Sequence, residues 1–215
     1  MATRRQILLG AGGIVAAAGA FGAWQYARRH AGLADLMTPD PLGDIMLGSA
    51  EAPVTIIEYA SMSCPHCARF ALVTFPEIRK RYIETGKVRF ILREFPLDRL
   101  AEAVSVVTRC ACNDDPQRYF ALTEALFREQ AAWLIDQPLP ALLAAAQQGG
   151  VSEATFNACL ANQQVLDGLE KGRRRAADAF QVRSTPTFFI NGTPHTGALT
   201  ADEMAALIDP YLKDG

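Results

Sequence analysis

The sequence predicts an α/β fold in which two strand-containing segments are separated by a block of helices. Three observations predict it. An apolar, β-branched run at residues 54–59 precedes a helical segment and a second strand, helical spacing then fills residues 97–180, and strand signals return only after residue 181. The 215 residues, of which 50% are hydrophobic, suffice for one full-sized domain with a large insertion and exclude a disordered chain.

The charge balance gives no indication of nucleic acid as a partner. The formal net charge is -2 at pH 7, and the basic residues are scattered apart from Arg173-Arg174-Arg175. That triplet is best explained as a solvated helix face. We therefore expect no nucleic-acid binding.

Residues 1–27 have the composition of an export signal or an N-terminal anchor. Arg4 and Arg5 precede an uncharged run from Ile7 to Ala27, and Ala18-Gly19-Ala20 offers a small-residue cleavage pattern. The start of the chain resembles a twin-arginine signal, although the basic residue common near the end of that motif is absent. An uncleaved anchor over residues 7–27 and a buried N-terminal helix are the alternatives.

Residues 28–43 predict a linker, because proline and glycine interrupt the chain from Leu33 to Gly48. Residues 44–96 then form a βαβ unit. Its expected elements are a short edge strand at 44–47, a strand buried on both faces at 54–59, a helix from Cys64 to about Glu84, and a strand at 88–94. Pro76 is expected to kink this helix and Gly86 to stop it.

Residues 97–180 predict an all-helical insertion. The boundaries of its helices are marked by Asp115 before Pro116, by Gly149-Gly150 and by Ser152. The expected helices are Leu97–Ala111, Pro116–Arg128, Pro138–Gln148, Ser152–Leu160 and Gln163–Phe180.

Residues 181–215 predict a ββα unit. Thr187–Ile190 and Thr193–Thr196 read as two strands of a hairpin, joined by Asn191-Gly192 in a type I′ turn. Thr200 and Glu203 form a capping box that opens a final helix to about Leu212.

Cys64-Pro65-His66-Cys67 is the motif that carries chemistry. Two thiols with two residues between them at a helix start lie within bonding reach, so the pair can switch between dithiol and disulfide. The helix N-terminus favours the thiolate of Cys64, and a protonated His66 adds a nearby positive charge. Cys67, one turn further along, is expected to be the more buried, resolving sulfur. The alternatives are a structural disulfide or half of a zinc site, but no second such pair completes four ligands, so we expect no metal.

Glu58 lies inside an otherwise apolar strand, where an ionised carboxylate is costly unless something compensates it. One interpretation is that it shuttles protons for Cys67. The other is an acid at a strand end that reaches solvent.

The remaining cysteines are Cys110, Cys112 and Cys159, and the total of five leaves at least one unpaired within the chain. Helical register places Cys110 on an apolar stripe and Cys112 on the polar line of the same helix. Cys159 also lies on an apolar face. We predict a Cys110–Cys159 disulfide with Cys112 unpaired, because disulfides persist in exported proteins. The alternative is two buried free thiols.

The chain resembles bacterial DsbA-like thiol:disulfide oxidoreductases over roughly residues 44–215. The resemblance depends on Cys64–Cys67, on Glu58 six residues before the motif, on Ser184-Thr185-Pro186-Thr187, and on Phe188-Phe189-Ile190-Asn191-Gly192. It implies a thioredoxin fold with an inserted all-helical domain. It also implies a buried acid at Glu58, a cis-proline at Pro186 against the active disulfide, and a substrate contact at Thr185.

Three functions compete. The first, implied by the resemblance, is a periplasmic dithiol oxidase without a cofactor, acting as a monomer on exported proteins with free thiols and reoxidised by a quinone-linked membrane partner. The second is an isomerase or reductase of the same fold. The third is a holdase or metal-binding protein in which the thiols do not turn over.

Overall fold

The computed structural model describes residues 32–135 and 137–213. The export signal or anchor predicted for residues 1–27 lies outside them. Within the described residues, no helix has both the length and the apolar character needed to cross a membrane. The chain divides into two units, residues 1–38 and 39–215. In the first unit residues 32–37 form a helix that the sequence did not predict within the linker: leucine, alanine and methionine favour a helix before Pro39 interrupts the chain.

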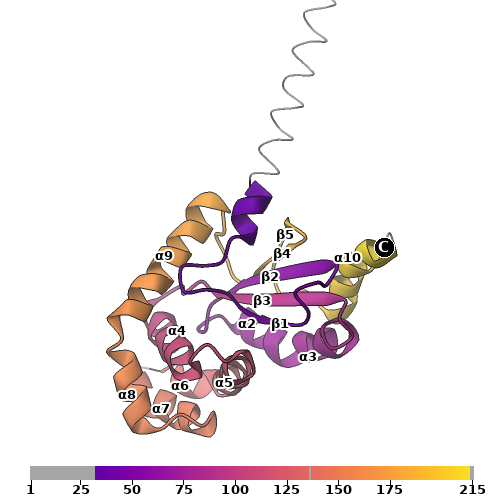
Figure 1. Ribbon diagram of the computed structural model, residues 1–215. Helices are drawn as coiled ribbons and strands as arrows, with labels where there is room; N and C mark the ends of the chain where they lie inside the picture. The colour runs from indigo at the N-terminus through magenta and orange to yellow at the C-terminus, as the bar shows by residue number, and fades with distance from the viewer. Residues whose placement is uncertain (1–31, 136, 214–215) are drawn as a thin grey trace, which may run out of the picture. The chain divides into compact units, whose positions relative to one another are not determined.

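A five-stranded sheet in the order β1-β3-β2-β4-β5 organises the second unit (Figure 1). β2 and β3 are parallel, and the other neighbouring pairs are antiparallel. The strands are β1 (Ile45–Leu47), β2 (Val54–Ala60), β3 (Val88–Glu94), β4 (Thr187–Ile190) and β5 (Thr193–Thr196). The predicted ranges of β3, β4 and β5 are confirmed, and β2 is buried along its whole length, as a strand covered on both faces should be.

The two predicted turn motifs of the last segment are also confirmed. Asn191 and Gly192 have φ values of 44° and 85°, as a type I′ turn requires. The Thr200 backbone N–H donates to Glu203 (2.8 Å), and the Glu203 N–H donates to the Thr200 hydroxyl (3.3 Å). This capping box opens α10 (Ala201–Lys213).

The helical stretch after the thiol motif covers one face of the sheet. Phe70 lies 4.6 Å from Phe188 and 6.4 Å from Phe90, measured between ring centroids. The stretch consists of α2 (Pro65–Arg69), a π-helical turn η1 (Phe70–Thr74), α3 (Phe75–Ile78) and a second π-helical turn η2 (Arg79–Ile83). Because Pro76 has no N–H and its ring crowds the preceding turn, the wider turn before it relieves the clash.

A block of helices occupies the part of the chain between β3 and β4 (Figure 1). The helices are α4 (Arg99–Cys112), α5 (Pro116–Arg128), α6 (Gln130–Trp133), α7 (Pro138–Gln148), α8 (Glu153–Leu160) and α9 (Gln163–Ala179). The start predicted at Leu97 is wrong, because the Asp98 side chain caps the Ala101 N–H and the helix begins after it. The short helix α6 was not predicted.

A disulfide in this block joins Cys110 of α4 to Cys159 of α8 across a sequence separation of 49 residues. Cys112 is a free thiol, but its predicted position on a polar, outward line is wrong, because it is fully buried whereas Cys110 is only partly buried. The polar line of α4 turns inward because α5, α8 and α9 pack around this helix. Ser105, Thr108 and Arg109 are buried with Cys112.

Charged side chains hold the segment before β1 against the second face of the sheet. Arg93 of β3 is almost fully buried and donates to both carboxylate oxygens of Asp44 at 2.9 Å, and it donates to the Tyr59 hydroxyl at 2.9 Å. The buried Asp40 lies against Gly172 of α9, where a Cβ atom would come within 2.2 Å of its Oδ2 atom. α9 therefore approaches this segment closely only because residue 172 has no side chain.

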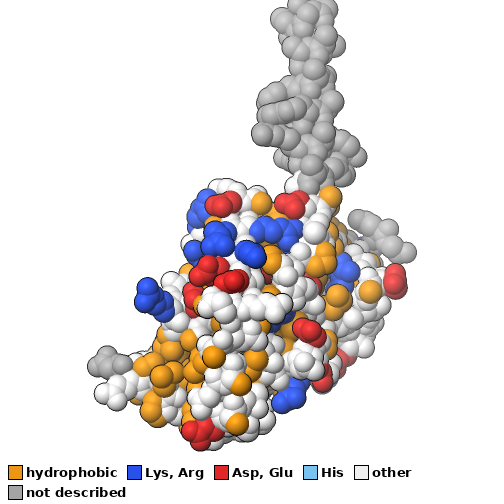
Figure 2. All heavy atoms as spheres, turned by 60° about the vertical axis from the view of Figure 1, so that its left-hand side comes forward, with side chains coloured by type: hydrophobic (Ala, Val, Ile, Leu, Met, Phe, Trp, Pro, Cys, Tyr) orange, Lys and Arg blue, Asp and Glu red, His pale blue; other side chains and the backbone are white. Residues whose placement is uncertain are grey.

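Hydrophobic side chains gather on the surface at the end of the helical block near α7 and α8 (Figure 2). Leu134, Ile135 and Leu139, around the connection from α6 to α7, are 40%, 53% and 53% exposed.

Candidate functional site

Cys64 lies at the N-cap position of α2, in an extended conformation, and Pro65 occupies the first turn. A proline suits this position because the N–H that it lacks would have no helical partner. The strand β2 ends four residues earlier, so Cys64 lies just beyond the carboxyl end of this strand, at the start of the helix. Cys64 is 6% exposed, Cys67 is 0% exposed, and both are free thiols.

Thr185 and Pro186 face the thiols from the start of β4. Their peptide bond is cis, and the Cys64 thiol donates to the Thr185 carbonyl at 3.3 Å. The Thr185 hydroxyl is buried and has no hydrogen-bond partner among the described residues. When Cys64 loses its proton, this hydroxyl is available to donate to the sulfur.

The pKa of the Cys64 thiol is lowered from its usual value to about 5. The hydrogen bond from the Cys67 thiol is the largest cause, and the Thr185 side chain and the backbone N–H groups of Cys67 and His66 add to it, against the opposing effect of burial. Cys64 is therefore a thiolate at neutral pH.

The pKa of Cys67 moves in the opposite direction and is raised well above its usual range. Burial is the largest cause, followed by the hydrogen bond that its thiol donates to Cys64 and by the negative charge of Glu58. One sulfur of the pair thus holds a negative charge while the other holds a proton.

Glu58 lies in the middle of β2, between Leu92 of β3 and Phe188 of β4, and is 4% exposed. Burial, and secondarily the charge of Cys64, raise the pKa of its carboxyl group to about 8. The interpretation as an acid at a strand end on the surface is wrong. Glu58 is a protonated carboxylic acid at neutral pH, placed near the two thiols.

The His66 side chain is exposed, as is Pro65. His66 contributes to the site chiefly through its backbone N–H, one of the groups that lower the pKa of Cys64. The sequence motif predicted a contribution from the imidazole charge, and exposure to water weakens such an interaction.

Gln130 is a site residue that the sequence did not reveal. Its side-chain amide donates to the carbonyl oxygens of Met62 (2.7 Å) and Cys64 (3.1 Å), so the start of α6 is tied to the loop that carries the thiols. The same loop is fastened by the Ser63 hydroxyl, which donates to Asp98 at 2.5 Å. A single glutamine in a helical region carries no sequence signal for such a role.

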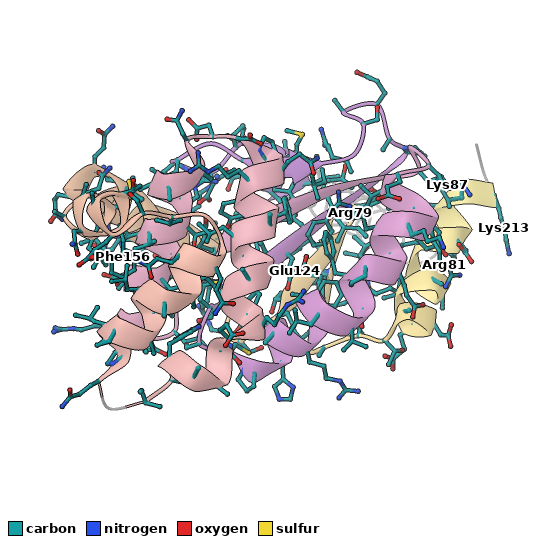
Figure 3. The ribbon with its side chains drawn as sticks, turned by 90° about the horizontal axis from the view of Figure 1, so that it is seen from below. Arg79, Arg81, Lys87, Glu124, Phe156 and Lys213 are labelled. Atoms are coloured by element: carbon teal, nitrogen blue, oxygen red, sulfur yellow. A yellow bond between two sulfur atoms is a disulfide. The ribbon has the colours of Figure 1, made fainter. Side chains whose placement is uncertain are left out.

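A cavity of about 320 Å³ lies beside Glu58, between the stretch that contains Pro76 and the helix α5. The aromatic part of its lining is formed by Phe75, Phe90, Phe120 and Phe127. Arg79 and Glu124, which also line it, come from the two helical elements on either side (Figure 3).

Two neighbouring thiols, one with a lowered and one with a raised pKa, can exchange with disulfides when they lie next to a cis-proline. A site of this kind on a sheet of this strand order defines the class of thioredoxin-fold proteins. A family profile described as "Thioredoxin" matches residues 41–210. The chain therefore belongs to the thioredoxin family.

Individual relatives indicate which thioredoxin-fold proteins this chain resembles. The crystal structure of Wolbachia pipientis α-DsbA1 is similar with a TM-score of 0.76 and 30% identity, covering 83% of this chain and 95% of that one. Disulfide bond formation protein D of Bacillus subtilis is 26% identical over 181 residues, which is 81% of this chain and 80% of the relative. These similarities confirm the resemblance to DsbA-like proteins.

A Rickettsia conorii protein with the provisional name protein-disulfide oxidoreductase is 31% identical over 172 residues. The match covers 80% of this chain and 61% of the relative. The chain thus spans about three fifths of the length of that relative.

Proposed function

We propose that the protein is a periplasmic thiol:disulfide oxidoreductase that acts as a dithiol oxidase on exported proteins. The observation that carries this proposal is the opposite acidity of the two thiols. Cys64 is stabilised as a thiolate and Cys67 as a thiol, which stabilises the reduced pair and makes the disulfide a better oxidant.

The oxidised protein starts with a Cys64–Cys67 disulfide. A substrate thiolate attacks the Cys64 sulfur, a bond forms between these two sulfurs, and the electron pair of the broken disulfide goes to Cys67. Because the pKa of Cys67 is raised, this sulfur takes up a proton, and the protonated Glu58 supplies it.

The second half of the reaction releases the product. A second substrate thiolate attacks the substrate sulfur of the mixed disulfide, and Cys64 leaves as the low-pKa thiolate, which is a good leaving group. The substrate gains a disulfide and the protein is left with two reduced sulfurs. We expect Thr185, whose backbone carbonyl accepts from the Cys64 thiol at 3.3 Å, to contact the substrate backbone.

The names of the relatives support thiol–disulfide chemistry, and the resemblance to DsbA-like proteins supports the oxidase direction, the periplasm and a quinone-linked membrane partner that reoxidises the protein. The Cys110–Cys159 disulfide supports an oxidising compartment.

The test is the acidity of Cys64 together with the redox potential of the pair. Thiolate absorbance of the reduced protein should titrate with a midpoint near 5, and a Cys64→Ser variant should lose this transition. Equilibration with glutathione should give a potential well above the about -270 mV of thioredoxin, toward the about -120 mV that is typical of DsbA. Ordinary cysteine acidity would overturn the proposal.

The alternatives give different results in the same preparation. The oxidase should oxidise a dithiol peptide rapidly and stoichiometrically. An isomerase should instead rescue a protein with scrambled disulfides, a reductase should show a potential near that of thioredoxin, and a metal-binding protein should take up copper or zinc without exchange.

A further inference from the structure

Gln130, at the start of α6, is a buried polar side chain that reaches from the helical block to the backbone of the thiol loop. Its exposed fraction is 7%, and its side-chain amide nitrogen donates to the carbonyl oxygens of Met62 (2.7 Å) and Cys64 (3.1 Å). An amide NH2 group has two donors, so one nitrogen can satisfy both carbonyl groups. Gln130 thus bonds to the backbone on both sides of Ser63, the residue that precedes the reactive cysteine.

The two carbonyl groups that accept from Gln130 determine where the Cys64 sulfur lies. Cys64 is the N-cap of α2, with φ -82° and ψ 119°, and its carbonyl oxygen also accepts from the Ala68 N–H at 3.1 Å. Each carbonyl group belongs to a rigid peptide plane, and between these two planes lie the backbone dihedral angles of Ser63 and Cys64. Holding both planes therefore restricts the position from which the side chain of Cys64 projects.

The hydrogen bonds of the Cys64 sulfur depend on that position. The Cys64 thiol donates to the Thr185 carbonyl at 3.3 Å. The pKa of Cys64 is lowered by the thiol of Cys67, by the Thr185 side chain and by the backbone N–H groups of Cys67 and His66. Hydrogen bonds weaken steeply when their distance or angle departs from the ideal. A small displacement of Cys64 therefore weakens several of these bonds together.

A separate set of hydrogen bonds holds the side chains of the same loop. The Leu97 N–H donates to the Ser61 hydroxyl at 3.2 Å, and the Ser63 hydroxyl donates to the Asp98 carboxylate at 2.5 Å. The hydroxyls of Ser61 and Ser63 lie 3.2 Å apart, and Ser61 is the donor of this pair because Ser63 gives its proton to Asp98. The loop therefore stays fastened to the start of α4 when the amide from α6 is removed.

We propose that Gln130 is a positioning residue for the exchange reaction, whose amide keeps the Cys64 sulfur in contact with Thr185 and the first turn of α2. The inference rests on the proposed function, because it concerns the reactive form of Cys64. An amide carries no charge, so Gln130 acts through the geometry of the loop. The ionisable groups that interact with the sulfur, Cys67 and Glu58, stay in place when Gln130 is replaced.

The test replaces Gln130 by methionine and by glutamate. Methionine is unbranched and adaptable, so Gln130→Met removes the donors with little change of volume. Gln130→Glu keeps the shape, but the ionised side chain presents only acceptor oxygens to the two carbonyl groups. Thr108→Val is the control, because it removes another buried hydrogen bond of the helical block, from the Thr108 hydroxyl to the Val104 carbonyl (2.8 Å). The thiolate titration and the redox potential are measured for each variant.

We expect Gln130→Met to raise the midpoint of the Cys64 titration by about one pH unit, since hydrogen bonds to the thiolate are weakened. Gln130→Glu should raise it further, because it adds a negative charge beside the loop. At pH 7 the equilibrium with glutathione should then shift about tenfold away from the reduced protein, which lowers the potential by about 30 mV. Thr108→Val should keep both the midpoint and the potential of the unmodified protein.

The outcomes separate this inference from the proposed function. If the unmodified protein titrates near 5 and Gln130→Met does the same, Gln130 has only a structural role, and the proposed function stands without the inference. If Thr108→Val shifts the midpoint as far as Gln130→Met does, the effect is not specific to the loop and the inference is again wrong. Ordinary cysteine acidity in the unmodified protein would overturn both. Should Gln130→Met fail to fold, the titration of Gln130→Glu decides the inference in the same way.

Discussion

Two cysteines separated by two residues differ in acidity because their surroundings differ. Cys64 lies at a helix start, where N–H groups and a neighbouring thiol donate to it, whereas Cys67 is enclosed by the core. The sequence predicted the lowered pKa of Cys64 from the helix start and the charge of His66, and the burial of Cys67 from its place one turn further along. It did not predict that the thiol of Cys67 makes the largest contribution to the acidity of Cys64, since that depends on the orientation of two side chains.

The buried acid has a consequence for stability that can be measured. The pKa of Glu58 is about 8 in the folded protein and near 4.5 in an unfolded chain. Between pH 4.5 and pH 8 its carboxyl group is therefore protonated in the folded state and ionised in the unfolded chain. The contribution of Glu58 to the free energy of unfolding is therefore fully present below pH 4.5 and is lost as the pH rises through 8, at up to about 1.4 kcal/mol per pH unit.

We expect Glu58→Gln to match the unmodified, reduced protein near pH 4 and to exceed it in stability by a few kcal/mol above pH 8. Denaturant unfolding at both pH values measures the difference. The gain should be smaller in the oxidised protein, because a disulfide removes the charge of Cys64, the second cause of the raised pKa. If the free energies of unfolding of the two proteins change with pH in parallel, the assignment of a raised pKa to Glu58 is wrong.

At the scale of helices and strands, capping residues and prolines predicted where several helices begin. Pro116, Ser152 and the Thr200–Glu203 box lie at or within a residue of helix starts, and the expected ranges of α5 and α7 are confirmed. The π-helical turn η1 before Pro76 could not be predicted, because it depends on how the helix accommodates the proline. The four-residue helix α6 is too short to give a periodic pattern.

Gly172 shows where packing overrides helix propensity. Alanine normally stabilises a helix by about 1 kcal/mol relative to glycine. At this position the new Cβ would meet the Asp40 carboxylate at 2.2 Å, and Asp40 is buried. We expect Gly172→Ala to lower the free energy of unfolding by about 1–3 kcal/mol.

Thermal unfolding of Gly172→Ala measures this loss, with Lys171→Ala on the exposed side of α9 as the control. Replacing Asp40 by Ala removes the obstructing carboxylate, so adding Gly172→Ala to Asp40→Ala should cost nothing or stabilise the protein. If Gly172→Ala is equally destabilising in both backgrounds, the contact with Asp40 is not the cause.

In the molecule as a whole, contacts between distant parts of the chain determine which side chains are buried and which of them meet. Helical register described α4 as having one apolar and one polar side, but three helices pack around it, so Cys112 is buried. The predicted pairing of Cys110 with Cys159 is confirmed, and the packing of α4 against α8 brings the two cysteines together. Gln130 joins the helical block to the loop of the thiols, a contact across 66 residues of sequence.

We expect the double variant Cys110→Ala and Cys159→Ala to lose stability without losing the chemistry of Cys64. Opening a link that spans 49 residues costs at most about 4 kcal/mol on the chain-entropy view. Chemical denaturation measures the loss. The thiolate titration of Cys64 should keep its midpoint, because the hydrogen bonds that set it come from Cys67, His66 and Thr185. A shifted midpoint would show that the helical block controls the active thiol.

The disulfide between Cys110 and Cys159 also has a consequence for the maturation of the protein. On the proposed function, each newly exported copy reaches its compartment with all sulfurs reduced and needs a crosslink of the very kind that mature copies donate. Older molecules can then crosslink younger ones. Each transfer passes two electrons to the Cys64–Cys67 pair of the donor, so every finished copy still depends on the partner that reoxidises that pair.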